Sequence, residues 1–121
     1  MFPRGWLRST RTFQRDAFKT DVSSLKGPRR ADYLQYNITA AFVELGELAQ
    51  EIGWKPWDTA RGWVNRRRVI SEATDVLMFL GNILVACDVS DNEIATELLR
   101  KRREVYDRQR TGTYTSKERA R

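Results

Sequence analysis

Four acidic residues, arranged in two pairs, are the part of this sequence best suited to chemistry. Glu44 and Glu47 are three residues apart, and so are Glu72 and Asp75. Residues three apart share a helix face, with Cβ atoms about 5–6 Å from each other, so each pair can direct two carboxylates to one place. Mg²⁺ and Mn²⁺ prefer such all-oxygen ligand sets. The spacing therefore predicts a divalent-metal site shared by two helices.

The alternative is that these carboxylates have purely structural roles. The first pair would then be solvated, and Glu72 and Asp75 would pair with arginines of the run 66–68. However, Glu72 and Asp75 stand inside an apolar stretch, 69–84, where an ionised carboxylate is costly unless it is paired or binds a metal. Two such pairs on neighbouring helices favour the metal site.

The composition excludes several other kinds of site. The 121 residues contain no His and one Cys, which excludes a Ser-His-Asp triad, a histidine metal ligand, an internal disulfide and a Cys-rich zinc site. The net charge is +6, but it is unevenly distributed. Segments 1–30 and 100–121 each carry +6, whereas 31–99 carries −6. An acidic centre between basic ends suits a site that holds cations centrally and phosphates at its margin.

The elements that position these residues are predicted to be helices, because apolar residues recur at three- and four-residue steps and no segment alternates like a strand. A capping box begins at Ser90, and Gly112 suits a helix end. We expect one all-α domain over 1–121, a four-helix bundle module with flexible ends at 1–9 and 115–121. The predicted helices cover about residues 10–20, 31–52, 66–87 and 90–110.

A module this short leaves wide apolar helix faces uncovered, so we expect a homodimer or homotetramer. No apolar run approaches the roughly 20 residues that span a bilayer, and the first residues lack the apolar segment of a secretory signal. We therefore expect a cytoplasmic protein with no membrane partner.

The two acidic pairs resemble the ExxE…ExxD signature of the all-α nucleoside triphosphate pyrophosphohydrolases, which include MazG-like enzymes and dimeric dUTPases. The similarity extends over 13–114, and the chain looks like a short, phage-type member. Met78 stands where the dUTPase motif has His, and Arg102 and Val105 replace two asparagines. The further matching motifs are Gln14-x-x-Ala17-x-x-Thr20, Trp54-Lys55-Pro56-Trp57, Lys101 with Arg108-Gln109, and Gly112-x-Tyr114.

The resemblance implies Mg²⁺-dependent hydrolysis of a nucleoside triphosphate to the monophosphate and pyrophosphate. The expected preferred substrate is dUTP, and another dNTP such as dGTP is the alternative. Mn²⁺ is a possible substitute for Mg²⁺. A water activated by the metal would be deprotonated by Glu47 or Glu51. The implied metal ligands are Glu44, Glu47, Glu72 and Asp75. The expected substrate-binding residues are Gln14, Asn37, Lys55, Trp57, Lys101, Arg108 and Tyr114.

Two other classes of function stay open. Basic ends and four Trp residues suit a nucleic-acid-binding helical module, which would contact phosphates and stack on bases. The acidic middle repels a phosphate backbone, so a stable nucleic-acid complex is not expected. A helical interaction protein without catalysis is the other alternative.

Overall fold

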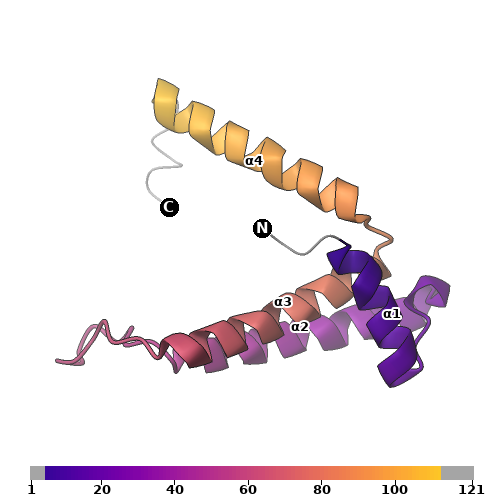
Figure 1. Ribbon diagram of the computed structural model, residues 1–121, viewed down its shortest axis with the longest axis horizontal. Helices are drawn as coiled ribbons and strands as arrows, with labels where there is room; N and C mark the ends of the chain where they lie inside the picture. Colours follow the sequence, from indigo (N-terminus) through magenta and orange to yellow (C-terminus); the bar gives the residue numbers. More distant parts are fainter. Residues whose placement is uncertain (1–4, 113–121) are drawn as a thin grey trace.

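The computed structural model describes residues 5–112, which form four α-helices and a short 3₁₀ helix (Figure 1). This confirms the predicted all-α fold class. Tyr114 and the segment 115–121 lie outside the described residues. The elements are α1 (Trp6–Phe18), η1 (Val22–Ser24), α2 (Gly27–Ala49), α3 (Arg66–Ala86) and α4 (Asp91–Thr111).

The start of α1 differs from the prediction. The helix begins at Trp6, four residues early, and Leu7 is fully buried, so the prediction of a flexible end at 1–9 is wrong from Trp6 onward. A carboxylate at the start of α4 stabilises this first turn. Asp91 accepts the backbone N–H of Leu7 at 2.7 Å and of Arg8 at 3.3 Å. An anion at this position satisfies free donors and complements the helix dipole.

α3 and α4 follow the predicted ranges to within one residue, whereas α2 begins four residues and ends three residues earlier than predicted. Pro28 lies in the first turn of α2, where its missing N–H costs nothing, so the helix begins at Gly27-Pro28. The capping box at Ser90 is formed, with Ser90 and Glu93 each accepting the other's backbone N–H at 3.1 Å. Gly112 ends α4 in the left-handed conformation.

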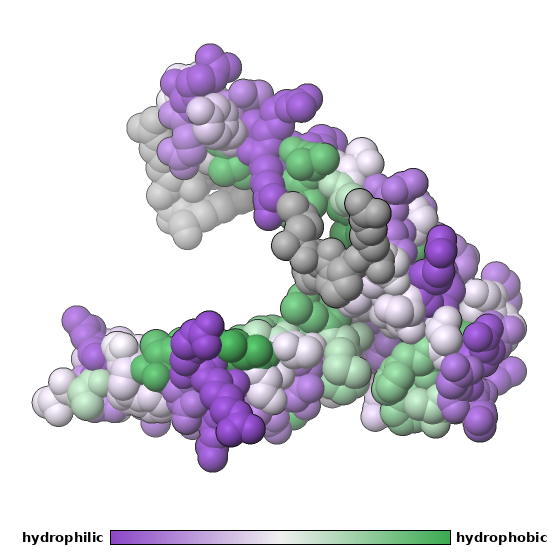
Figure 2. Space-filling model, in the orientation of Figure 1, coloured by the Kyte–Doolittle hydropathy of each residue, from purple (hydrophilic) through white to green (hydrophobic). Residues whose placement is uncertain are grey.

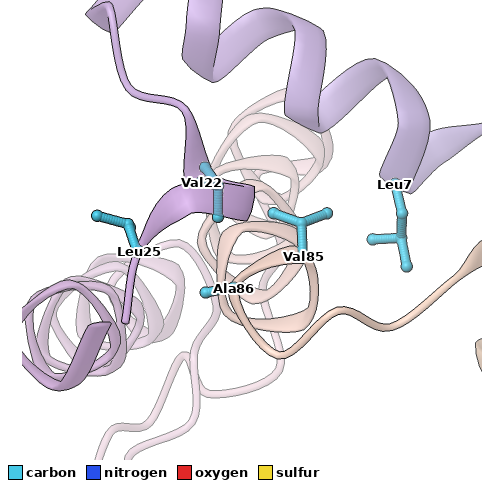
Figure 3. Close-up of a cluster of buried hydrophobic side chains, with 5 residues drawn as sticks. All are labelled: Leu7, Val22, Leu25, Val85 and Ala86. Carbon is cyan, nitrogen blue, oxygen red and sulfur yellow. The ribbon is translucent and has the colours of Figure 1, made fainter. Parts of the chain in front are cut away.

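α2 and α3 form a helical hairpin, and α1 packs across α3 near the end of that hairpin (Figure 1). The main hydrophobic core lies where α1, η1 and the last turn of α3 meet (Figure 3). This core anchors α1 against the hairpin. Its buried members are Leu7, Val22, Leu25, Val85 and Ala86.

The connection 50–65 between α2 and α3 is ordered by backbone pairing. The N–H of Gly53 donates to the Trp63 carbonyl at 2.7 Å, and the N–H of Gly62 donates to the Gly53 carbonyl at 2.7 Å. A Cβ at Gly53 would lie 2.6 Å from Cδ1 of Trp63, so only glycine permits this close approach. The connection projects beyond the end of the hairpin (Figure 1).

α4 stands apart from the hairpin. Among the helices of the described chain it packs only against α1, and the molecule is hollowed between α4 and the hairpin (Figure 2). Within residues 5–112, more large hydrophobic side chains are exposed than buried, and the exposed ones include Phe42, Ile70 and Tyr106. Surface of this kind is typical of a protein–protein contact.

By length and composition alone, α3 could cross a membrane. A core helix of a soluble protein passes the same test, so this property carries little weight. α3 packs against α2 and α1, and it carries Glu72 and Asp75 within its apolar stretch.

Candidate metal centre and adjoining pocket

The α2–α3 hairpin brings three of the four predicted carboxylates together. Glu44 of α2 and Glu72 and Asp75 of α3 each contribute one oxygen, and these oxygens lie within 4.8 Å of one another. All three side chains are half-buried. We call Glu44, Glu72 and Asp75 the acidic group.

Two oxygens of the acidic group lack partners within the described chain. Oε2 of Glu44 and Oε2 of Glu72 are buried and accept no hydrogen bond there. A buried carboxylate oxygen without a donor is unfavourable, and a cation would satisfy both oxygens at once. Because the donors are all carboxylates, with no nitrogen or sulfur, the group fits a hard divalent cation such as Mg²⁺ or Mn²⁺.

Burial and mutual repulsion raise the pKa values of this group. Burial is the main cause that raises the pKa of Glu44 to about 7, and the nearby carboxylate of Glu47 adds to it, followed by the charge of Asp75. The pKa of Glu72 is raised by burial first and by Glu47 next. Glu47 itself is exposed, so it lies beside the acidic group without being one of its three close members.

These shifts predict how pH and metal affect stability. The folded-state pKa of Glu44 lies above its ordinary 4.5, so its contribution to the stability of the metal-free protein is complete at acid pH and is lost as pH rises through about 7. We expect the metal-free melting temperature to fall between about pH 5 and pH 8. Mg²⁺ competes with protons for these oxygens, so it should raise the melting temperature by several degrees at about pH 8 and by much less at about pH 5.5.

Thermal denaturation at both pH values, with Mg²⁺ or with EDTA, measures this effect. The variant Asp32→Asn removes an acidic residue from the exposed face of α2 and should leave the Mg²⁺ effect unchanged. A Mg²⁺ effect of equal size at both pH values would contradict metal binding by the acidic group.

A pocket of about 630 Å³ opens beside Glu44 and Asp75, a volume typical of small-molecule sites. Its walls come from α1, α2, α3 and the segment after α1, and they combine aromatic rings with two carboxamides. A larger open groove of about 1170 Å³ lies along α1 but includes none of the acidic group. The pocket lining is Phe13, Gln14, Phe18, Thr20, Tyr33, Tyr36, Asn37, Glu44, Asp75, Met78 and Phe79.

Buried amides and a tyrosine organise one wall of this pocket. The hydroxyl of Tyr33 donates to Oε1 of Gln14 at 2.9 Å. Nδ2 of Asn37 donates to the Tyr33 carbonyl at 2.8 Å, and Nδ2 of Asn82 donates to Oδ1 of Asn37 at 2.9 Å. Burial raises the pKa of Tyr33, and the neighbouring Asn37 amide opposes that rise. The predicted residues Gln14 and Asn37 thus reach the same pocket as the carboxylates.

Three other predicted residues are not brought to this place. Glu51 forms an ion pair with Arg68 at 3.6 Å and is not a member of the acidic group. Lys55 and Trp57 belong to the projecting connection and do not line the pocket. Trp57 is 74% exposed and contacts Trp54 edge to face, with ring centroids 5.9 Å apart.

The predicted phosphate-binding cations are also separate from the carboxylates in the single chain. Lys101 and Arg108 lie on α4, which packs against α1 and not against the hairpin. Arg108 donates to Glu104, one turn earlier, at 2.7 Å. Tyr114 falls outside the described residues.

Two residues of the pocket wall, Tyr33 and Phe79, and the residue Asn82 that supports the wall through Asn37 were not predicted from the sequence. Phe79 and Asn82 follow Asp75 by four and seven residues, and Tyr33 precedes Asn37 by four. These are steps along one helix face, so a search at such steps from the predicted site residues could have found them. Asn82 in particular is a polar residue within an apolar helix.

A family model described as dUTPase matches residues 14–116. No curated protein and no solved structure gives a significant match. The matched region extends from the last turns of α1 to beyond α4 and contains the acidic group and most of the pocket wall.

Proposed function

The chain belongs to the dUTPase family, a family of all-α nucleotide hydrolases, and on that premise we propose that it hydrolyses a nucleoside triphosphate to the monophosphate and pyrophosphate with Mg²⁺. The observation that supports this most is the shared position of two features. Glu44 and Asp75 belong both to the acidic group and to the pocket lining. A nucleotide could therefore place its phosphates at the carboxylates and its base in the pocket.

The acidic group would hold Mg²⁺, or Mn²⁺ in its place. Such an ion neutralises phosphate charge and increases the acidity of a bound water. Glu47 is exposed beside Glu44 and Glu72, which suits it to accept a proton from the attacking water. Glu51 is less suited to that role because it is paired with Arg68.

The pocket wall favours a base that presents carbonyl oxygens. Oε1 of Gln14 already accepts from Tyr33, and Oδ1 of Asn37 already accepts from Asn82. Nε2 of Gln14 is then the side of that carboxamide that faces a ligand, whereas Nδ2 of Asn37 has one hydrogen left beyond its bond to the Tyr33 carbonyl. Uracil offers two carbonyl acceptors, whereas cytosine has an amino group in place of one. We therefore propose dUTP as the preferred substrate, with dGTP as the purine alternative.

A second copy of the chain would complete this site. Phosphate binding needs cations, and Lys101 and Arg108 lie on a helix that does not reach the hairpin of its own chain. Lys101 precedes the exposed apolar Val105 by four residues and Arg108 follows it by three, so all three lie on one face of α4. We propose a homo-oligomer in which α4 of one chain covers the hairpin of its partner and brings these cations to the partner's acidic group.

A nucleotide panel tests the proposed function. Each dNTP and NTP is incubated with the full chain and Mg²⁺, and the released pyrophosphate is measured. We expect kcat/KM for dUTP to exceed that for dCTP by at least about tenfold, the effect of about 1.4 kcal/mol in transition-state binding. EDTA should abolish turnover. A chain that hydrolyses no nucleotide and instead binds DNA with a steep salt dependence would favour a nucleic-acid-binding module.

A further inference from the structure

We propose that Asn82 is a positioning residue for base recognition, which acts by holding the carboxamide of Asn37 in the pocket wall. Asn82 lies on α3, outside the acidic group, and lines the larger groove along α1 but not the 630 Å³ pocket that holds Glu44 and Asp75. For a base held in the 630 Å³ pocket, the contact through which Asn82 acts is therefore its hydrogen bond to Asn37. The inference rests on the proposed function, because it concerns the base end of the same site.

The contact between the two asparagines is buried and direct. Asn37 is 1% exposed and Asn82 is 8% exposed, and the bond from Nδ2 of Asn82 to Oδ1 of Asn37 measures 2.9 Å. It joins α2 to α3, three and four residues before the buried Val85 and Ala86 of α3. A buried amide oxygen that loses its donor incurs a desolvation penalty, so Asn37 depends on Asn82 to keep its place.

The partners of Asn37 permit one orientation of its carboxamide. The Tyr33 carbonyl can only accept, so it must face Nδ2 of Asn37, at 2.8 Å. Asn82 supplies the donor that Oδ1 of Asn37 then requires. With both bonds made, the remaining hydrogen of Nδ2 is fixed relative to the helix. Loss of Asn82 would leave the orientation with one restraint in place of two.

The same wall is tied to α1 through Tyr33, whose hydroxyl donates to Gln14. Gln14, Tyr33 and Asn37 therefore lie within one set of contacts that begins at Asn82 and spans three helices. A leucine at position 82 would serve simple packing between helices without the cost of burying amides. A polar pair at this point is better explained by the pocket that it supports.

Kinetics of single and double variants test the inference. The readout is the ratio of kcat/KM for dUTP to that for dCTP, two substrates that differ at the base alone. We expect Asn82→Ala to lower this ratio by about tenfold, mainly through a higher KM for dUTP, with kcat little changed. In a chain that already carries Asn37→Ala, Asn82→Ala should leave the ratio unchanged, because the residue acts through Asn37.

Two further variants separate positioning from loss of folding. Asn82→Asp keeps the shape of the side chain, but its ionised form cannot donate to Oδ1 of Asn37, so it should lower the ratio as Asn82→Ala does. Asn92→Ala removes an exposed asparagine of α4 and should change nothing. Circular dichroism identifies the variants that remain folded.

The inference is overturned if the folded Asn82 variants keep the wild-type ratio within twofold, or if Asn82→Ala changes it equally with and without Asn37. Calorimetric binding of dUMP and dCMP in EDTA repeats the comparison without turnover. A wild-type chain that binds dUMP but hydrolyses nothing refutes the proposed function, while the binding ratios still decide the role of Asn82. A wild-type chain that binds neither nucleotide refutes both.

Discussion

Replacing Glu72 with glutamine should lower Mg²⁺-dependent pyrophosphate release by about 10²–10³-fold, the usual effect of removing one electrostatic stabiliser of a transition state. Glutamine keeps the size of the side chain but not its negative charge, so the acidic group would lose one anionic ligand. Its amide can also donate to Glu44 or Glu47, whose carboxylates lie beside it. The metal-free variant should therefore unfold at a higher temperature than the wild type above about pH 7.

Activity and thermal denaturation of the same preparation distinguish this outcome from simple misfolding. The matched control is Asp32→Asn, which makes the same change of charge at an exposed position of α2 and should keep wild-type turnover. A Glu72→Gln protein that retains more than about one tenth of its turnover would remove Glu72 from the metal ligands, since a ligand is expected to matter far more.

Local signals in the sequence predicted most of the fold. The apolar periodicity of α2 and α3 can be identified from residues close together in the sequence. The same is true of the capping box at Ser90 and of the helix end at Gly112. The start of α1 was not predictable in this way, because Asp91, which caps it, is 84 residues from Leu7. The separation of α4 from the hairpin was likewise not predictable, since helical periodicity gives the apolar face of a helix but not the surface that covers it.

Spacing within each helix likewise predicted only part of the candidate site. Spacing within each helix correctly paired Glu72 with Asp75, but it could not show that Glu47 is exposed while Glu44 turns into the group. That difference depends on the rotation of α2 against α3. The pairing of Glu51 was also not predictable from spacing within one helix, because its partner Arg68 lies on the other side of the connection between α2 and α3. Sequence spacing gives the helix face, and tertiary packing decides which members of that face meet.

The separation of α4 from the hairpin leads to the second prediction with a large expected effect. If each site combines the acidic group of one chain with α4 of its partner, two different inactive chains should restore activity when they are joined. One chain carries Glu72→Gln, and the other carries Lys101→Ala with Arg108→Ala. Each is expected to be nearly inactive alone. In their hybrid dimer, one site contains both defects and the other contains none, so the hybrid should recover about half of the wild-type activity.

Co-expression with two different affinity tags, followed by purification through both, yields the hybrid for the pyrophosphate assay. The matched control is a hybrid of Glu72→Gln with Asp75→Asn. These substitutions damage the same half of the site, so each of its two sites keeps a defect and no activity should return. Recovery in the first hybrid and not in the second requires that cations and carboxylates come from different chains.

An inactive first hybrid, or a wild-type chain that is monomeric by light scattering, would mean that α4 does not complete the partner's site. Lys101 and Arg108 could then reach the acidic group only if α4 closed onto the hairpin of its own chain, a movement that would give up the packing against α1 seen in the structure.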